Sequence, residues 1–337
     1  MSDIHLTREL LWAAYRGEVH PDLVSRITNQ HLACLCPSCR EEIQAFRRRV
    51  REGDDAELGA VRLLPALLEK YGPRLEKEHL QARRDLKALL AMDPEHRALK
   101  VRGARTRFRG AELARLLIAE SEERVQADPD EAYHLADLAR QILNQSPNLL
   151  GDFAPLVLAL GAMANARRAR GLLRDAEARF EHLRTVIRKW GVTDPDVTAR
   201  IDELEGSLRK DQRRFDEAEE LLIRSEVFYH FAGNESGATR VLLILGSAKD
   251  AQGQPEEAIQ FVRAALNRIP ADVKPRLYLG ARYNLTYYLS RVGELDEAMD
   301  LLEQDAVLYR ELADPHFQLR VAWLRGDIAR ARGEDES

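Results

Sequence analysis

A repeat of about 40 residues constrains this 337-residue chain more than any other feature of its sequence. Four alanines share an acidic setting and follow one another at intervals of 42, 40 and 40 residues: Ala176, Ala218, Ala258 and Ala298. A fixed period of roughly 20 to 50 residues is typical of a solenoid, in which each unit packs only on its neighbours. The spacing therefore predicts a one-dimensional array of similar units in the C-terminal half.

The best-preserved unit places small residues at fixed steps. Gly246, Gly253, Ala258, Ala265 and Pro270 are separated by seven, five, seven and five residues. This pattern resembles the tetratricopeptide repeat (TPR), a helix-turn-helix unit with small residues at the helix crossing and a proline after the second helix. The other three units match in part, at Leu285, Leu289, Gly293, Ala298 and Leu302, at Gly206 and Ala218, and at Gly171, Ala176 and Phe180.

The resemblance implies an all-α fold, a TPR-like helical-hairpin solenoid with a concave face. Gly246, Ala258 and Ala265 are then packing residues, because a larger side chain would overfill the space between two helices. A period of 40 rather than the usual 34 residues implies longer helices or longer connections. The concave face is expected to bind a protein partner as an extended peptide or a helix.

Composition narrows the class of protein. The chain is 45% hydrophobic and 32% charged, with a formal net charge of -5, which fits a soluble, helix-rich protein and gives no bulk attraction to nucleic acid. No apolar run approaches the roughly 18 residues of a membrane span, and the N-terminus lacks the plan of a secretory signal. A cytoplasmic protein is expected.

Polar breaks divide the chain into three predicted parts: a helical head over 1–52, irregular helical hairpins over 53–150 and a TPR-like superhelix over 151–337. Residues 51–55 form the first break. In the middle part, Asp128 followed by proline and two acids predicts a helix N-terminus. Apolar residues at helical spacing predict helices from Ala111 and Glu131 onward.

The head carries the chain's three cysteines within six residues, Cys34, Cys36 and Cys39. Two thiolates in a Cys-x-x-Cys at a helix start favour a soft metal such as Zn²⁺. His31 can supply a nitrogen ligand, and His5 or His20 a further one. The alternative is that the cysteines are small core residues around a helix turn.

The segment from Glu9 to Cys39 resembles the zinc-binding domain of bacterial anti-sigma factors. That resemblance assigns the zinc ligands to His5, His31, Cys36 and Cys39 and implies a structural zinc ion. Four residues, rather than the usual three, separate His31 from Cys36, so Cys34 is a possible substitute ligand. Control of a sigma factor is one role that the resemblance implies; a small structural head is the other.

A basic run over 97–109 is the main alternative signal. Arg102, Arg105 and Arg107 could contact phosphate, which would make the protein a nucleic-acid-associated regulator. The competing interpretation is a solvated helix face that pairs with the acidic run 120–123. No P-loop, nucleophile elbow or zinc-protease motif occurs in the sequence, so an enzyme is not expected.

Asn284 and Tyr287 are the best candidates for partner binding, because an asparagine at this place in peptide-binding repeats faces the concave groove. Other aromatic residues could line a peptide groove or belong to the core: Phe228, Tyr229, Phe231, Tyr283 and Tyr288. The scaffold and nucleic-acid hypotheses differ in whether binding survives nuclease treatment and high salt.

The last segment matches the first helix and turn of a fifth repeat, through Trp323, Leu324, Gly326 and Gly333. The second helix of that repeat would begin near the final residue. We expect Val321, Trp323, Leu324 and Ile328 to be exposed, frayed or covered by something else. Either the chain is a fragment of a longer array, or another chain or a second copy supplies the missing helix and forms an oligomer.

Overall fold

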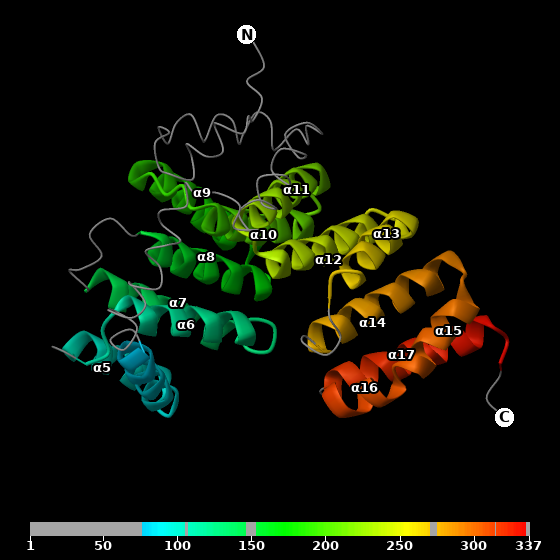
Figure 1. The fold of residues 1–337 in the computed structure, drawn as a ribbon, viewed down its shortest axis with the longest axis horizontal. Coiled ribbons are helices and arrows are strands. Elements are labelled where there is room, and N and C mark those ends of the chain that lie inside the picture. The colour runs from blue at the N-terminus through cyan, green and yellow to red at the C-terminus, as the bar shows by residue number, and fades with distance from the viewer. Residues whose placement is uncertain (1–75, 105–106, 146–152, 270–274, 314, 335–337) are drawn as a thin grey trace, which may run out of the picture. The chain divides into compact units, whose positions relative to one another are not determined.

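The computed structural model describes residues 76–104, 107–145, 153–269, 275–313 and 315–334. Every regular element in these ranges is a helix, so the predicted all-α fold is confirmed for the described part of the chain (Figure 1). The described residues fall into two compact units, one ending at Gln212 and the other starting at Arg213. This division lies inside the predicted superhelix of residues 151–337.

The first unit contains a helix over 76–90 followed by six more. They are α5 (Pro94–Gly103), α6 (Ala111–Arg124), α7 (Pro129–Asn144), α8 (Ala154–Ala169), α9 (Leu173–Trp190) and α10 (Pro195–Asp211). From α6 onward each helix packs against the next, and α8 also contacts α10. Asp128 caps α7 as predicted, since its side chain accepts a hydrogen bond of 3.0 Å from the backbone N–H of Glu131.

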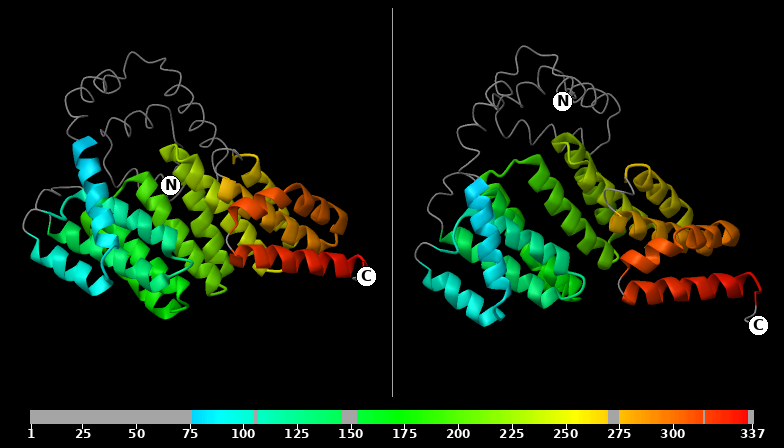
Figure 2. Two further views of the ribbon diagram at one scale, coloured as in Figure 1. Left: turned by 90° about the horizontal axis from the view of Figure 1, so that it is seen from below. Right: turned by 60° about the horizontal axis from the view of Figure 1, so that its bottom comes forward.

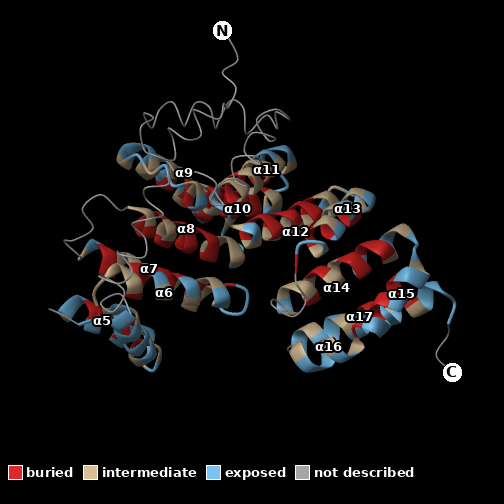
Figure 3. Ribbon diagram, in the orientation of Figure 1, coloured by how far each residue is buried: buried red, intermediate tan, exposed pale blue. Residues whose placement is uncertain are grey.

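The second unit contains α11 (Phe215–Ala232), α12 (Glu235–Ala251), α13 (Pro255–Leu266), α14 (Pro275–Val292), α15 (Leu295–Gln304), α16 (Ala306–Leu312) and α17 (Pro315–Ala331). Consecutive helices from α11 to α15 pack against one another. The predicted lengthening is seen in α12 and α14, which have 17 and 18 residues. Figure 3 shows buried residues along α12 and α14 and mostly exposed ones on α16 and α17.

The repeat register sets the core. All four acid-flanked alanines are 0% exposed, and the apolar residues four positions later, Phe180, Leu222, Val262 and Leu302, are 0% exposed as well. A row of small residues twelve positions before the alanines is also buried: Ala164, Gly206, Gly246 and Thr286. Each repeat thus buries a small residue of its first helix and an alanine of its second.

The turn between the two helices of each repeat has the same backbone form. Gly171, Gly253 and Gly293, each five residues before the alanine, have φ of 81°, 82° and 88°. Positive φ is easy for glycine and strained for other residues. Arg213 holds the same position in the remaining repeat and still adopts φ 59°.

The C-terminal helix corrects one expectation. Leu324 and Ile328 are only 5% and 1% exposed, because α17 turns this side toward the core shared with α14 and α15. Trp323, on another side of the helix, is 75% exposed as expected. In both views of Figure 2, α17 (red) lies on the outside of the second unit.

Candidate functional site

The two candidate partner-binding residues lie on one side of α14. An α-helix turns about 100° per residue, so Asn284 lies about 160° around the helix from Thr286, the small residue buried toward α15. Asn284 is half-buried, Tyr287 is 37% exposed, and Tyr288 is buried at 4%. The equivalent residue of Asn284 on α12 is Ile244, also half-buried. We call the row Ile244, Asn284, Tyr287 and Arg291 the first-helix face.

Contacts between repeats hold this face in place. Arg291 Nη1 on α14 lies 2.7 Å from Asp250 Oδ1 on α12, which joins the first helices of two repeats. Arg263 on α13 and Glu297 on α15 join the second helices at 2.8 Å. First helices therefore form one layer of this unit and second helices the other. The first-helix face is the surface of the first layer.

Electrostatics keep this face neutral next to its aromatic residues. Burial raises the pKa of Asp250, and the charge of Arg291 offsets part of that rise. Burial also raises the pKa of Tyr288, and the neighbouring carboxylate of Asp250 raises it further. Tyr288 therefore keeps its proton and packs as a core residue, with Tyr287 at its edge at a ring distance of 5.7 Å.

Most of the other predicted groove aromatics are core residues. Tyr229, Tyr283 and Phe228 are 1%, 8% and 9% exposed. Gly237 explains the depth of Tyr229, because a Cβ atom there would lie 2.6 Å from the tyrosine ring. Helical spacing therefore reported packing at these positions, as the alternative interpretation held.

The described arginines of the basic run are used inside the first unit. Arg107 Nε donates to Asp85 Oδ1 at 2.8 Å, and Arg102 Nε donates to Gln141 Oε1 at 3.3 Å. Arg97 is 6% exposed and pairs with Glu131. The expectation that these arginines pair with the acidic run 120–123 is wrong in its partners, because the helix hairpin brings α7 and the 76–90 helix nearer. Arg105 lies outside the described residues.

The predicted zinc ligands, His5, His31, Cys36 and Cys39, lie outside the described residues, as do Cys34 and His20. Within the described ranges, no group of three or more His, Cys, Asp or Glu side chains is placed to hold a metal ion. No helix in these ranges is long and apolar enough to cross a membrane.

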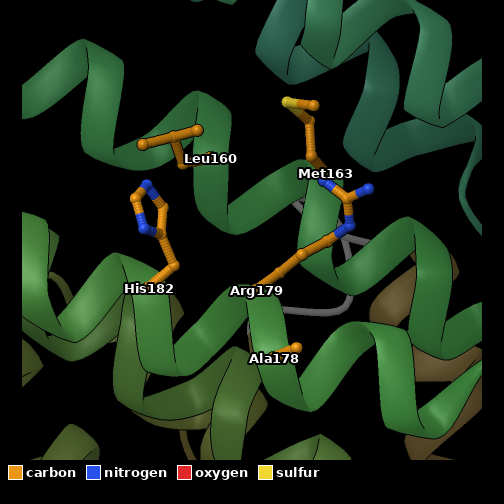
Figure 4. Close-up of a pocket in the computed structure, with 5 residues that line it drawn as sticks. All are labelled: Leu160, Met163, Ala178, Arg179 and His182. Atoms are coloured by element: carbon orange, nitrogen blue, oxygen red, sulfur yellow. The ribbon is translucent and has the colours of Figure 1, made fainter.

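The structure adds a pocket that the sequence did not indicate. It lies in the first unit between α8 and α9, has a volume of about 240 Å³, and is lined by Leu160, Met163, Ala178, Arg179 and His182 (Figure 4). Leu160 and Met163 come from α8, and the other three come from α9. The lining therefore combines apolar side chains with an arginine and a histidine.

Two arginines next to this pocket share one tyrosine. The guanidinium carbons of Arg167 and Arg179 lie 3.9 and 5.2 Å from the centre of the Tyr133 ring. Asp175 Oδ2 lies 3.2 Å from the Nε atom of each arginine and offsets part of their charge. A site of this composition can hold an apolar group beside an acidic one. Its residues come from three helices, and no periodic signal links them in the sequence.

Comparison with known proteins gives similarity in fold only. No protein-family model matches the chain, and no curated protein matches it. The crystal structure of BtubC (BKLC) from P. vanneervenii is similar at a TM-score of 0.48 and 18% identity, over 65% of this chain and 84% of that one. A putative kinesin light chain with nearly identical TPR-like repeats from Podosopora anserina is similar at a TM-score of 0.42 and 16% identity, over 61% of this chain and 99% of that one.

Proposed function

We propose that this protein is a protein-interaction scaffold, and that the first-helix face of its second unit binds a segment of a partner protein. The observation that carries the proposal is the row on α14, where an exposed tyrosine lies between an amide and a cation. Tyr287 is 37% exposed although Tyr288 beside it is buried, and Asn284 and Arg291 lie one turn before and after it.

Each member of the row suits a peptide. A tyrosine ring offers a large, rigid contact area at little cost in conformational entropy. The amide of Asn284 has both donors and an acceptor for a peptide backbone. Arg291, whose side chain is 40% exposed, can approach a carboxylate of the partner while its Nη1 stays on Asp250.

The nucleic-acid alternative has less support. A phosphate contact needs guanidinium groups that can leave their own partners, and Arg102 and Arg107 already donate to side chains of the same unit. The formal net charge of -5 also disfavours binding to a polyanion.

The head of residues 1–52 is proposed as a docking or regulatory module with a structural zinc ion. Thiolates from Cys36 and Cys39 and imidazoles from His31 and His5 make a ligand set that Zn²⁺ accepts at four-coordinate sites. Anti-sigma-like control of transcription would be one use of such a module.

The scaffold hypothesis is tested by a photo-crosslinking amino acid at position 287, in extract treated with nuclease. A protein partner should be captured there, and Asn284→Ala should reduce capture. The control probe is placed at position 99, where Leu99 is 64% exposed in the first unit. Equal capture at both positions, or loss of capture on nuclease treatment, would rule out this face as the binding site.

A further inference from the structure

Two rows of residues that are buried in the earlier repeats are open on α17. The first row contains Ala199, Thr239 and Leu279 at 0%, 2% and 3% exposure, and its next member at the same interval is Leu319, which is 67% exposed. The second row is Gly206, Gly246 and Thr286, all buried, and its next member is Gly326, which is exposed. The first helix of a repeat is thus present with its inner surface uncovered.

Gly246 and Gly326 show the difference at one position. A Cβ atom on Gly246 would lie 3.2 Å from the carbonyl oxygen of Ala258, because α13 crosses there. At Gly326 no heavy atom of the described residues lies within 4 Å of that point. Gly333 follows with φ 74°, the backbone form found at Gly253 and Gly293. The register of the repeat therefore continues through α17.

The exposed surface is a single helical stripe. Leu319, Ala322, Trp323 and Gly326 recur at intervals of three and four residues, so they lie on one side of α17. We call them the open face. The opposite side holds the helix in place through Leu324 and Ile328, which are buried. An exposed tryptophan and leucine on one anchored helix are typical of a binding surface.

The array itself shows which kind of helix fits such a surface. In each earlier repeat the covering helix has acidic residues in its first turn: Asp175 in α9, Asp216 and Glu217 in α11, Glu256 and Glu257 in α13, and Asp296 and Glu297 in α15. An alanine and, four residues later, a larger apolar residue then pack inward, and all of these are 0% exposed.

Charge complements this pattern at one end. In two repeats a basic residue one turn after the small residue contacts the acidic first turn: Lys249 Nζ lies 3.2 Å from Glu257, and Arg167 Nε lies 3.2 Å from Asp175. Arg330 holds the equivalent place on α17, and its side chain is 78% exposed. Its 3.2 Å contact with Asp327 is a surface pair between neighbouring turns and is weakly held.

We propose that the open face of α17 binds an amphipathic helix of a partner protein, with an acidic first turn beside Arg330 and an alanine seated on Gly326. A second copy of this chain is a poorer occupant, because α9, α11, α13 and α15 already bury their alanines completely. The helix would bury Trp323, which supplies the largest apolar contact on the face.

The probe is a fluorescein-labelled peptide of residues 252–269 of this chain, which contains the sequence of α13. It should bind the intact protein with saturable anisotropy. Gly326→Leu, which fills the seat, and Trp323→Glu should each weaken binding by about tenfold or more. Gly280→Leu is the matched control, because Gly280 on α14 also has no heavy atom within 4 Å among the described residues.

A charge exchange tests orientation. A peptide with Glu256→Lys and Glu257→Lys should bind the wild type several-fold more weakly, and Arg330→Glu in the protein should restore part of the loss. Circular dichroism checks that each variant is folded. Tyr287→Ala should leave peptide binding unchanged, so this result is independent of the first-helix face.

Three outcomes would overturn the proposal. One is no binding up to about 1 mM peptide, the limit of weak specific association. Another is equal binding by wild type and Gly326→Leu. The third is concentration-dependent dimerisation in light scattering that Trp323→Glu abolishes, because the face would then be occupied by a second copy.

Discussion

The carbonyl oxygen of Ala258 lies 3.2 Å from the point that a Cβ atom on Gly246 would occupy. The two residues are twelve positions apart on neighbouring helices, and the same pairing of small residues recurs in each repeat. Close approach of the helix axes depends on both members, because either larger side chain would have to displace backbone.

Ala258→Leu and Ala298→Leu should therefore each lower the free energy of unfolding by about 1–3 kcal/mol through overpacking. Ala119→Leu on α6 is the control, since Ala119 is exposed and leucine is also a good helix former. Thermal melts give the comparison. Wild-type midpoints for both core variants would show that the repeat register is wrong.

Arg213→Gly should stabilise the protein. Arg213 adopts φ 59° at the turn where the other repeats have glycine, and a left-handed conformation costs a non-glycine residue about 1–2 kcal/mol. The entropy that glycine loses on folding cancels part of this gain, which leaves about 0.5–1 kcal/mol. Chemical denaturation measures the change.

The reciprocal change, Gly253→Arg, should destabilise the protein, because Gly253 has φ 82°. A stabilising effect of this variant would contradict the backbone account, as would a loss of stability in Arg213→Gly.

Glu226 should make a pH-dependent contribution to stability. Burial acts to raise its pKa, but hydrogen bonds and charges from His230 and Arg268, at 3.1 and 3.2 Å, outweigh burial and hold the pKa below its usual value. A carboxyl group whose pKa is lower in the folded state stabilises the fold above its unfolded value of about 4.3. The contribution is lost as the pH falls through the folded pKa.

Glu226→Gln should accordingly lower the melting temperature at pH 7, and the difference from wild type should shrink in acid below about pH 4. Glu303→Gln, at an exposed position of α15, serves as the control with little change at either pH. A difference for Glu226→Gln that is the same at both pH values would assign its effect to packing instead.

The N-terminal head should carry about one zinc ion per chain. Protein purified without a histidine tag should contain near-stoichiometric zinc by elemental analysis, and Cys36→Ser with Cys39→Ser should remove it, because a tetrahedral site needs its thiolates. Metal-free protein with a stable head would contradict the ligand assignment to His5, His31, Cys36 and Cys39.

The repeat itself could be predicted because its signal is local. Four alanines and the glycines five residues before three of them fix which residues face inward, and the structure places all four alanines in the core. Which exposed residues would form a surface was harder. Tyr287 and Tyr288 are adjacent and identical in type, and only the packing of α12 against α14 separates an exposed ring from a buried one.

Other features depend on contacts that a linear pattern does not contain. No glycine or proline occurs between 295 and 312, yet the helix breaks there into α15 and α16. The break lies at Asp305, which is 4% exposed and accepts a hydrogen bond of 2.6 Å from Arg282 Nε on α14. The pocket beside Tyr133 is of the same kind, since α7, α8 and α9 each contribute one part of it and its surroundings.

Because Gly253 and Gly293 occupy the same turn exactly one period apart, the repeat can be exchanged as a block. Removing residues 253–292 would join Gln252 to Gly293, and α12 would then be followed by the same left-handed turn and by α15. Gly246 would meet Ala298 in place of Ala258, a substitution of one alanine for another. Inserting the block twice would lengthen the array by the same logic, so the number of repeats is a variable that selection or a designer can change without altering any helix pair.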